Sequence, residues 1–351
     1  MTVRTPLNLL PYGGTSPALA GEPRHAGAGH ALIGRIALGR AAWLGAGAVI
    51  RADGHHVRAG DDLHLGRGAT VHIAHDVYPT LIGDRVTVGA NAVVHACTVG
   101  DDCVIEPDSV ILDGSVVEAA SVIESGSVVF ARSQLQGGWL YAGRPAKAVR
   151  ELRPGELTER RTALRARNEA APGEWTHADQ LAEIDPTAFV ANTAVLRGRI
   201  HAAERTSIWY GCRLDAGSGE ILVGARSNVQ DNSVLATGGG ALRIGVDTTI
   251  GHNVELAACR IGDRCLIGIG SRVAAGTVVE DDVFLAAGAV TLPGQVLASG
   301  FLWGGQPARE LTALDKRKKA LVLETIITYC AYADELMQAQ AAAGAGIAAD
   351  E

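Results

Sequence analysis

An apolar residue recurs at every sixth position over long stretches of the chain, and this period constrains the fold more than any other feature. An α-helix repeats about every 3.6 residues and a strand about every 2, so neither element alone produces a period of six. The period instead predicts a parallel β-helix built from hexapeptides, in which each repeat forms a short strand and a turn, and three repeats complete a triangular coil. The longest uninterrupted run in the first half is Val99, Ile105, Ile111, Val117, Ile123 and Val129.

Both halves of the chain carry this period, with one irregularity in each. A five-residue step replaces the six-residue step between Val94 and Val99, and again between Leu256 and Ile261. Ordinary β-hairpins would not keep one register through six consecutive repeats, so inward-pointing aliphatic residues of a β-helix are the better interpretation. Besides the run above, the residues expected to point inward are Leu38, Leu44, Ile50, Ile82, Val88, Val94, Ile184, Val190, Leu196, Ile208, Leu214, Val223, Val229, Leu235, Ile244, Ile250, Leu256, Ile261, Ile267, Val273, Val279 and Leu285.

The composition fits narrow stacked layers rather than a large conventional core. Only 4% of the residues are aromatic while 44 are Gly, and small side chains stacked in identical layers account for both values. Gly and Asp follow the inward residue in several repeats, as at Gly83-Asp84 and Gly262-Asp263. We expect these residues to adopt the unusual backbone dihedrals of the turns.

Charge and apolar content exclude several classes of protein. With 47% apolar residues and a net charge of −7, the chain is expected neither to be disordered nor to bind nucleic acid. No apolar run reaches the ~18 residues of a membrane-spanning helix, and the first residues lack the apolar region of a signal peptide. None of the six cysteines forms a C-x-x-C pair, so we expect reduced thiols in a cytoplasmic protein rather than a cysteine zinc site.

The two halves are copies of one another. Residues 140–147 match residues 302–309, and residues 97–103 match residues 259–265. The offset between the copies is 164 before the loop at residues 77–81 and 162 after it, because that loop is longer in copy one. We therefore predict two tandem left-handed β-helix domains, residues 1–173 and 174–351, divided at Pro172-Gly173. A charged helix near residues 156–171 follows copy one, and a longer helix near residues 314–337 follows copy two.

Polar motifs interrupt the apolar pattern at fixed places, and their order resembles that of the gamma-class carbonic anhydrases. The motifs lie at residues 50–53, 70–72, 93–97, 228–234 and 250–252, and the similarity runs from about 32 to 150 and from 184 to 311. The resemblance implies trimers of left-handed β-helices that hold zinc between subunits. Two His ligands then come from one subunit and a third from its neighbour, assisted by an Arg-x-Asp motif and a Gln-Asp pair.

Each role that the resemblance implies survives in only one copy. Copy one keeps the Arg-x-Asp motif as Arg51 and Asp53, and two metal ligands as His72 and His95; copy two has Asp215, Gly217, Ala236 and Ala257 in their places. Copy two keeps the Gln-Asp pair as Gln230 and Asp231, and the third metal ligand as His252; copy one has Gly66, Arg67 and Ala90 in their places.

This split is ordered, since copy one retains the two-His side and copy two retains the one-His side. Independent decay would have left some roles in both copies and some in neither. We therefore predict one composite site, in which His72 and His95 of copy one meet His252 of copy two. On the opposite sides, Asp215 and Arg67 have exchanged charge, which predicts a reversed ion pair at an interface without metal.

The resemblance also implies the chemistry of such a site. Three neutral imidazoles suit Zn²⁺, and Fe²⁺ or Co²⁺ fit the same ligands. Metal-bound hydroxide would attack CO₂ or another small carbonyl substrate. Gln230 would orient the reacting molecules, Arg51 would pair with Asp231, and Asp53 would hold Arg51. Tyr141 matches a position close to the metal, with simple packing as the other interpretation.

Several alternatives remain open from sequence alone. The same metal site would serve a hydrolase, dehydratase or cyclase acting on a small metabolite; a hexapeptide acyltransferase and a non-catalytic scaffold subunit are the other classes. We expect a homo-oligomer formed through β-helix faces. The helix after copy two has an apolar stripe, which we expect to cover a coil or pack on a neighbour. One of four further histidines would shuttle protons, unless all are simple loop residues: His55, His56, His64 and His75.

Overall fold

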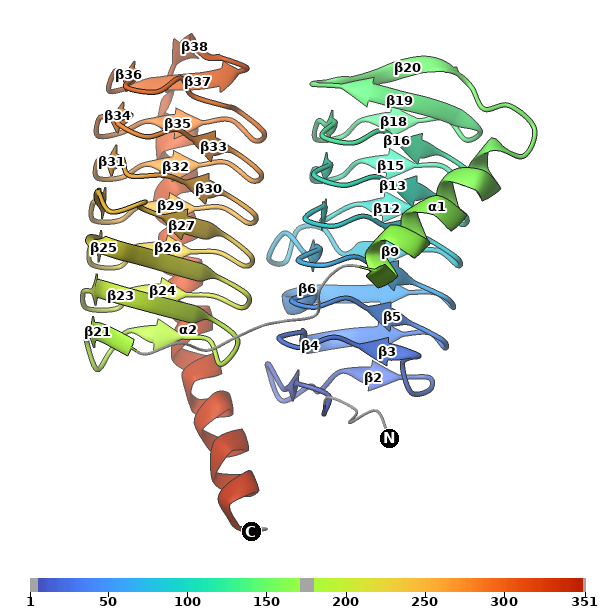
Figure 1. Ribbon diagram of the computed structural model, residues 1–351, viewed down its shortest axis with the longest axis horizontal. Helices are drawn as coiled ribbons and strands as arrows, with labels where there is room; N and C mark the ends of the chain where they lie inside the picture. The colour runs from blue at the N-terminus through green and yellow to red at the C-terminus, as the bar shows by residue number, and fades with distance from the viewer. Residues whose placement is uncertain (1–5, 171–179, 350–351) are drawn as a thin grey trace. The chain divides into compact units, whose positions relative to one another are not determined.

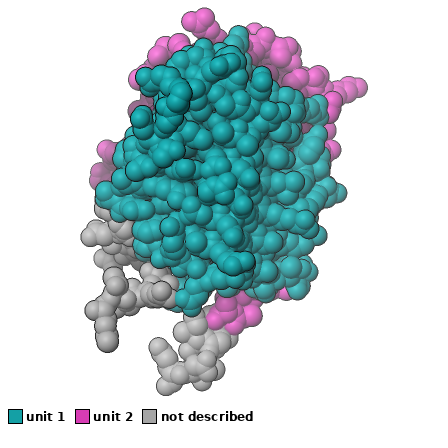
Figure 2. All heavy atoms as spheres, turned by 90° about the vertical axis from the view of Figure 1, so that its right-hand side faces the viewer, with its two compact units in different colours: residues 1–175 teal, residues 176–351 magenta. Residues whose placement is uncertain are grey.

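The computed structural model describes residues 6–170 and 180–349 and divides the chain into two compact units, Met1–Trp175 and Thr176–Glu351 (Figure 2). Each unit is a parallel β-helix whose short strands stack coil upon coil, followed by one α-helix (Figure 1). This architecture confirms the predicted fold class. The predicted boundary at Pro172-Gly173 lies outside the described residues.

Unit 1 has three faces, and long strands join two of them into one twelve-stranded sheet. Strand β6 makes this join, because its first residues pair with β8 and its last residues pair with β9. The twelve strands are β1 (Leu9–Leu10), β2 (Ala18–Leu19), β4 (Ala31–Leu38), β6 (Val49–Ala59), β8 (Thr70–His72), β9 (Thr80–Ile82), β11 (Val93–His95), β12 (Thr98–Val99), β14 (Val110–Ile111), β15 (Val116–Val117), β17 (Val128–Val129) and β18 (Gln134–Leu135). The third face comprises β3 (His25–Ala26), β5 (Trp43–Leu44), β7 (His64–Leu65), β10 (Thr87–Val88), β13 (Val104–Ile105), β16 (Val122–Ile123), β19 (Trp139–Gly143) and β20 (Ala146–Glu151).

Unit 2 repeats this plan with a ten-stranded and an eight-stranded sheet. The ten-stranded sheet comprises β21 (Gln180–Ile184), β23 (Val195–Ala202), β25 (Arg213–Val223), β27 (Val234–Ala236), β28 (Ala241–Ile244), β30 (Glu255–Leu256), β31 (Arg260–Ile261), β33 (Arg272–Val273), β34 (Val278–Val279) and β36 (Val296–Leu297). The eight-stranded sheet comprises β22 (Phe189–Val190), β24 (Ser207–Ile208), β26 (Asn228–Val229), β29 (Thr249–Ile250), β32 (Leu266–Ile267), β35 (Phe284–Leu285), β37 (Phe301–Gly305) and β38 (Ala308–Ala313).

Strand register explains the six-residue period. Val88 pairs with Ile105, and Ile105 pairs with Ile123, so each aliphatic residue stacks on the equivalent residue of the next coil. All three are fully buried inside the coil, as the period predicts. Burying an aliphatic side chain of this size contributes about 1.5–3 kcal/mol, and the stack repeats that contribution at every coil.

The turns do not use the residues that we expected. Gly83 and Asp84 have ordinary dihedrals, and Arg85 instead carries the left-handed conformation, with φ of 57°. Gly83 is required for space, since a Cβ there would lie 2.7 Å from the backbone nitrogen of Asp101 in the next coil. Asp84 donates its backbone N–H to the Asp101 carboxylate at 2.9 Å, which ties successive turns together. The expectation of unusual dihedrals at Gly83-Asp84 was therefore wrong, because the unusual dihedral occurs at Arg85, the residue after Asp84.

One α-helix packs on each unit, and the two helices differ in chemistry. Helix α1 (Glu156–Ala170) of unit 1 is held by ion pairs from Arg160 to Glu106 at 2.7 Å and from Arg165 to Asp62 at 2.9 Å. Helix α2 (Lys316–Ala349) of unit 2 is anchored by aromatic contacts, including Tyr329 on Trp209 with ring centroids 5.1 Å apart. Helix α2 is longer than the predicted 314–337, because the Ala-rich segment that follows has high helix propensity.

Two further observations concern the cysteines and the helices. All six cysteines are free thiols, five of them buried and Cys330 half-buried. Among the described residues, every helix is too short or too polar to cross a membrane.

Candidate metal centre

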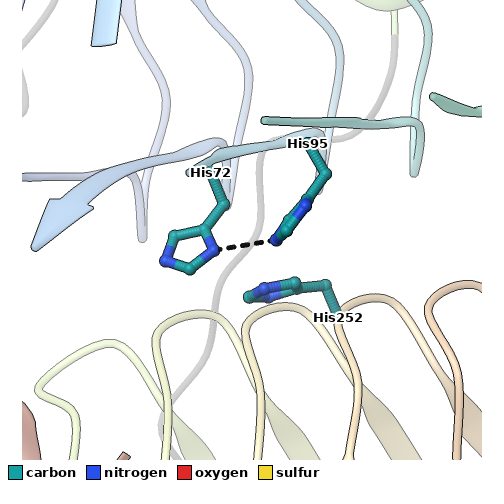
Figure 3. A group of neighbouring side chains, drawn as sticks. All are labelled: His72, His95 and His252. Carbon is teal, nitrogen blue, oxygen red and sulfur yellow. Dashed lines mark hydrogen bonds between the residues drawn. The ribbon is translucent and has the colours of Figure 1, made fainter. Parts of the chain in front are cut away.

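Two histidines of unit 1 stand side by side on neighbouring strands. His72 ends β8 and His95 ends β11, and the two residues are paired in register. Both rings point the same way from the sheet, and Nδ1 of His72 lies 3.2 Å from Nε2 of His95 (Figure 3). The register of the β-helix thus brings together residues 23 positions apart, as the sequence predicts for two ligands from one copy.

A carboxylate holds the other nitrogen of each ring. Nε2 of His72 lies 3.1 Å from Oδ1 of Asp53, and Nδ1 of His95 lies 2.6 Å from Oδ1 of Asp113. In a neutral imidazole one nitrogen carries the proton, and a neighbouring carboxylate selects the nitrogen that donates. Both outer nitrogens therefore donate to carboxylates, and two lone pairs face each other across the 3.2 Å contact.

This arrangement fits a divalent metal ion. Lone pairs facing each other at this distance repel unless a cation lies between them. Zinc takes imidazole nitrogens at about 2.0–2.1 Å in tetrahedral geometry, which places two ligand nitrogens about 3.3 Å apart. The observed 3.2 Å between His72 and His95 matches that spacing. Carboxylates on the outer nitrogens are also the usual support of metal-binding histidines.

Arg51 and Asp53 support the pair from strand β6. The two residues are separated by two positions, so their side chains leave the strand on the same face. Both are buried, and the guanidinium of Arg51 forms an ion pair with Asp53. Asp53 thus bridges Arg51 and His72, in agreement with the prediction that it holds Arg51. The first half-site is defined as Arg51, Asp53, His72, His95 and Asp113.

His252 of unit 2 follows β29 and is fully buried. Its Nδ1 lies 3.1 Å from Oδ2 of Asp231, and its Nε2 lies 3.4 Å from the hydroxyl of Tyr329 on α2. The other oxygen of Asp231 accepts a hydrogen bond from the backbone N–H of Tyr210 at 3.1 Å. Asp231 is thereby fixed by its own coil, and it fixes His252 in turn.

Gln230 is oriented by a chain of amide hydrogen bonds. Its Nε2 donates to Oδ1 of Asn228 at 3.2 Å, and Nδ2 of Asn228 donates to Oγ1 of Thr249 at 3.0 Å. Because these contacts engage the nitrogen of the Gln230 amide, they also fix the direction in which the amide oxygen points. The second half-site is defined as Gln230, Asp231, His252 and Tyr329.

Each histidine has been kept or lost together with its carboxylate. Register relates Val93 and Val110 of unit 1 to Glu255 and Arg272 of unit 2, so His95 and Asp113 correspond to Ala257 and Ala275. The other two pairs follow the same rule: His72 and Asp53 correspond to Ala236 and Gly217, and His252 and Asp231 correspond to Ala90 and Arg67.

In unit 1, Asn168 of helix α1 occupies space that corresponds to the Gln230 side chain of unit 2. A Cβ at Gly66 would lie 2.6 Å from the backbone nitrogen of Ala90 in the next coil and 2.7 Å from Oδ1 of Asn168. The amide nitrogen of Asn168 donates to the backbone oxygen of Val88 at 3.1 Å, which anchors the side chain there. The next coil and Asn168 together therefore exclude a glutamine side chain at position 66. In unit 2, Asp215 and Ala236 of the opposite side are exposed.

Two residues of the half-sites were missed in the sequence. Asp113 lies 18 residues after His95, one residue beyond the position that strand register puts opposite His95 on the next coil, so the repeat itself could have identified it as a neighbour. Tyr329 belongs to α2, whose apolar stripe we interpreted only as packing. No repeat relates a residue of this helix to a position on the coil, so the sequence held no signal for the contact with His252.

The remaining candidates lie elsewhere. Tyr141 is buried inside the coil, stacked on Ile123, and donates its hydroxyl hydrogen to the backbone oxygen of Gln136 at 2.9 Å. These contacts correspond to packing inside the coil, and the place of Tyr141 beside the metal stays a prediction. His55 and His56 contact each other, with their Nδ1 atoms 3.0 Å apart. His75 lies in the turn after β8, with φ of 40°.

His64 is not a solvated loop residue but a buried one. Its ring stacks parallel to Trp43 at 5.3 Å, and Trp43 stacks on His25 at 4.1 Å. Within the described residues neither ring nitrogen of His64 has a hydrogen-bond partner. Burial, aided by the positive charges of Arg165 and Arg24, lowers the pKa of His64 to about 3. A buried imidazole that stays neutral at physiological pH is unsuited to carry protons to solvent.

We expect His64→Asn to flatten the acid dependence of stability. The unfolded histidine takes up a proton below about pH 6.5, whereas folded His64 stays neutral to about pH 3, so acidification stabilises only the unfolded chain. Wild-type stability should therefore fall by up to about 1.4 kcal/mol per pH unit in this window. Asn stands at the equivalent place in unit 2 as Asn228.

Thermal unfolding from pH 7 to pH 4 measures this difference. The half-exposed His201 provides a control, because His201→Asn removes a histidine without removing a buried one. Equal pH slopes for the wild type and His64→Asn would show that the carboxylate ion pairs alone cause the acid sensitivity.

Comparisons with known proteins agree with the repeat and with the order of motifs. A family model for the bacterial transferase hexapeptide (six repeats) matches residues 79–112, and one for the hexapeptide repeat of succinyl-transferase matches residues 259–291. Gamma carbonic anhydrase 1, mitochondrial, of Arabidopsis thaliana is 36% identical over 174 residues, which cover 48% of this chain and 62% of that protein. The match thus spans less than two thirds of the plant relative's length.

Two shorter relatives are matched over most of their length. Protein YrdA of Escherichia coli (strain K12) is 31% identical over 167 residues, covering 45% of this chain and 91% of that protein. The probable carbonic anhydrase of Methanocaldococcus jannaschii is 39% identical over 129 residues, covering 37% of this chain and 80% of that protein. Together with the two repeat regions, these matches show that the chain belongs to the gamma carbonic anhydrase-like hexapeptide-repeat family, as a tandem duplication.

Proposed function

We propose that this protein is a metal-dependent enzyme of the gamma carbonic anhydrase type, with one kind of site assembled from the first half-site of unit 1 and the second half-site of unit 2. His72 and His95 of unit 1 and His252 of unit 2 are the proposed metal ligands, as the order of the motifs predicts. The observation that carries this proposal is the joint retention of each histidine with its carboxylate. A histidine without a function would not keep its carboxylate in one copy while both are lost in the other.

We propose zinc as the ion, because three neutral imidazoles are typical zinc ligands, although Fe²⁺ and Co²⁺ fit the same donors. When bound, such an ion supplies a Lewis acid that lowers the pKa of water to about 7. Asp53 and Asp113 each accept a hydrogen bond from the outer nitrogen of one histidine, and so hold the ligating nitrogen in place before the ion arrives. The carboxylate of Asp231 lies 3.1 Å from Nδ1 of His252 and favours the same orientation of that ring by charge.

The other side chains act on the substrate and on the contact between half-sites. The fixed amide of Gln230 orients the reacting molecules by hydrogen bonding, and its own orientation comes from Asn228. Arg51, already paired with Asp53, is proposed to pair also with Asp231. That ion pair would join the two half-sites next to the metal ligands. The hydroxyl of Tyr329 lies 3.4 Å from Nε2 of His252, the nitrogen proposed to bind the metal, so this hydroxyl adjoins the proposed metal position.

The proposed substrate is CO₂ or another small molecule with an electrophilic carbonyl carbon. Relatives named carbonic anhydrases favour CO₂, whereas the duplication with unequal halves favours specialisation on a different metabolite, through hydrolysis, dehydration or cyclisation. We propose that the chain forms homo-oligomers through its β-helix faces and acts in the cytoplasm, although the plant relatives are named as mitochondrial.

Metal analysis and stopped-flow CO₂ hydration test this proposal together. Protein loaded with zinc should bind one equivalent per pair of half-sites and should hydrate CO₂ faster than buffer alone. Bound zinc without hydration would remove CO₂ as substrate and retain the metal site. Binding of acetyl-CoA by protein that takes up no metal would instead favour the acyltransferase class. Absence of both activities and of metal would favour a scaffold subunit.

A further inference from the structure

Helix α2 has an apolar stripe on the face turned away from its own coil. Leu323 and Ile327 are 58% and 61% exposed, the largest values among the apolar residues of this helix. Ala320 and Ala331 are also exposed, and the spacing of these four residues places them on one face. The opposite face is buried against unit 2 through Val322, Ile326, Tyr329, Tyr332 and Leu336. The helix is therefore apolar on two faces, and its own coil covers only one of them.

Charge is distributed unevenly along the same helix. Four consecutive cations, Lys316 to Lys319, form its first turn, and Asp334 and Glu335 lie about five turns further on. The side chain of Asp334 remains 60% exposed although it pairs with Arg205 at 2.7 Å, so it is accessible to a second cation. One end of the stripe is therefore basic and the other acidic, with Leu323 and Ile327 between them and the exposed Glu324 at their border.

We propose that two molecules of this chain associate through antiparallel α2 helices. In an antiparallel pair centred between Leu323 and Ile327, each Leu323 faces the Ile327 of the other molecule. The same register places Lys316 opposite Asp334, and Ala320 opposite Cys330. A pair related by one two-fold axis therefore brings the two apolar stripes together and places the basic end of each helix against the acidic end of the other, as a self-complementary interface requires. A parallel pair would place the four cations against one another.

The alternative occupants fit less well. An anionic membrane surface would be attracted by the basic first turn but repelled by Asp334 and Glu335 at the other end of the same stripe. Helix α1 offers no comparable face, since it is rich in arginine and glutamate. The paired surface is small compared with the ~1,200 Å² or more that stable interfaces bury, so we expect a reversible, concentration-dependent association.

Disulfide trapping tests the register in the full-length chain. Cys330 is half-buried and the other five cysteines are buried, so few thiols compete. In the variant Ala320→Cys, mild oxidation should give a covalent dimer through the new cysteine and Cys330 of the other molecule. Adding Cys330→Ser should abolish the cross-link. A cross-link that persists in the double variant would join two introduced cysteines and would overturn the antiparallel register.

Sedimentation velocity tests the association itself. The substitution Leu323→Glu with Ile327→Glu should weaken the association at least tenfold. Leu321→Glu is the matched control, because Leu321 is 45% exposed but lies off the stripe, and it should leave the association unchanged. Equal association of both variants would overturn the proposal, as would binding of the wild type to phosphatidylserine vesicles, but not to itself, in a manner that the double variant loses. None of these readouts depends on the metal centre.

Discussion

Replacing His252 by alanine should remove most of the metal from the protein. The proposed site has three protein ligands, and each ligand of a four-coordinate zinc site contributes roughly 3 kcal/mol to apparent binding. Loss of one imidazole should therefore lower zinc affinity on the order of a hundred- to a thousandfold. Competition with a chromophoric chelator measures this change, and circular dichroism shows whether the coils remain folded.

The decisive comparison is among histidine variants. His72→Ala and His95→Ala should behave as His252→Ala does, although His252 belongs to the other unit. His55→Ala is the control, because His55 contacts His56 and lies outside both half-sites. Full zinc content in His252→Ala, with loss in His72→Ala, would restrict the metal to unit 1 and refute the composite site.

Mixing variants also shows which molecules contribute to a site. If the two half-sites of one site come from different molecules, co-expressed His72→Ala and His252→Ala chains should recover part of the zinc, since one combination of half-sites is intact. If both come from the same molecule, every site in the mixture lacks a ligand, and no zinc is recovered.

Replacing Asp113 by asparagine should weaken metal binding by about 10–100-fold while leaving all three ligands in place. Asp113 accepts from Nδ1 of His95 at 2.6 Å, which holds Nε2 toward His72. An asparagine amide can present its NH₂ group to the ring, and this favours the wrong tautomer. The same chelator competition measures the loss, and a shift of the His95 ring signals in NMR spectra reports the tautomer.

The matched control is Asp101→Asn, on a turn of the same β-helix. The Asp101 carboxylate accepts a hydrogen bond from the backbone N–H of Asp84 at 2.9 Å and is not a member of the first half-site. We expect its zinc affinity to match the wild type. Equal affinity for all three proteins would show that Asp113 neutralises surface charge without tuning the metal ligand.

The repeat made the fold predictable to the level of individual residues. A β-helix obliges every inward residue to meet its equivalent one coil away, so the sequence alone predicts that Val88, Ile105 and Ile123 point inside. The turn residues were harder, because Gly83 is required by the approach of the next coil and not by its own dihedrals. Contacts between coils decide such positions, and a single repeat does not contain them.

The site was predictable in part, and for two different reasons. His72 and His95 end paired strands, and resemblance to known motifs singled them out together with His252. The position of Asp113 beside His95 follows from the coil spacing, which relates polar residues of neighbouring coils as it relates the inward apolar ones. Tyr329 could not be found, because a helix packed across a coil has no register with it. His64 looked like a loop residue among histidines, yet its stacking on Trp43 and its burial set its chemistry.

The contact between Asn168 and Gly66 has a consequence for the history of the duplicated gene. A side chain restored at position 66 would meet both Asn168 of the helix and the backbone of the next coil, so glutamine there produces a clash. Any lineage returning to two equal halves would need changes both in the helix and on the coil. The unequal distribution of site residues between the two halves is therefore difficult to reverse by single substitutions.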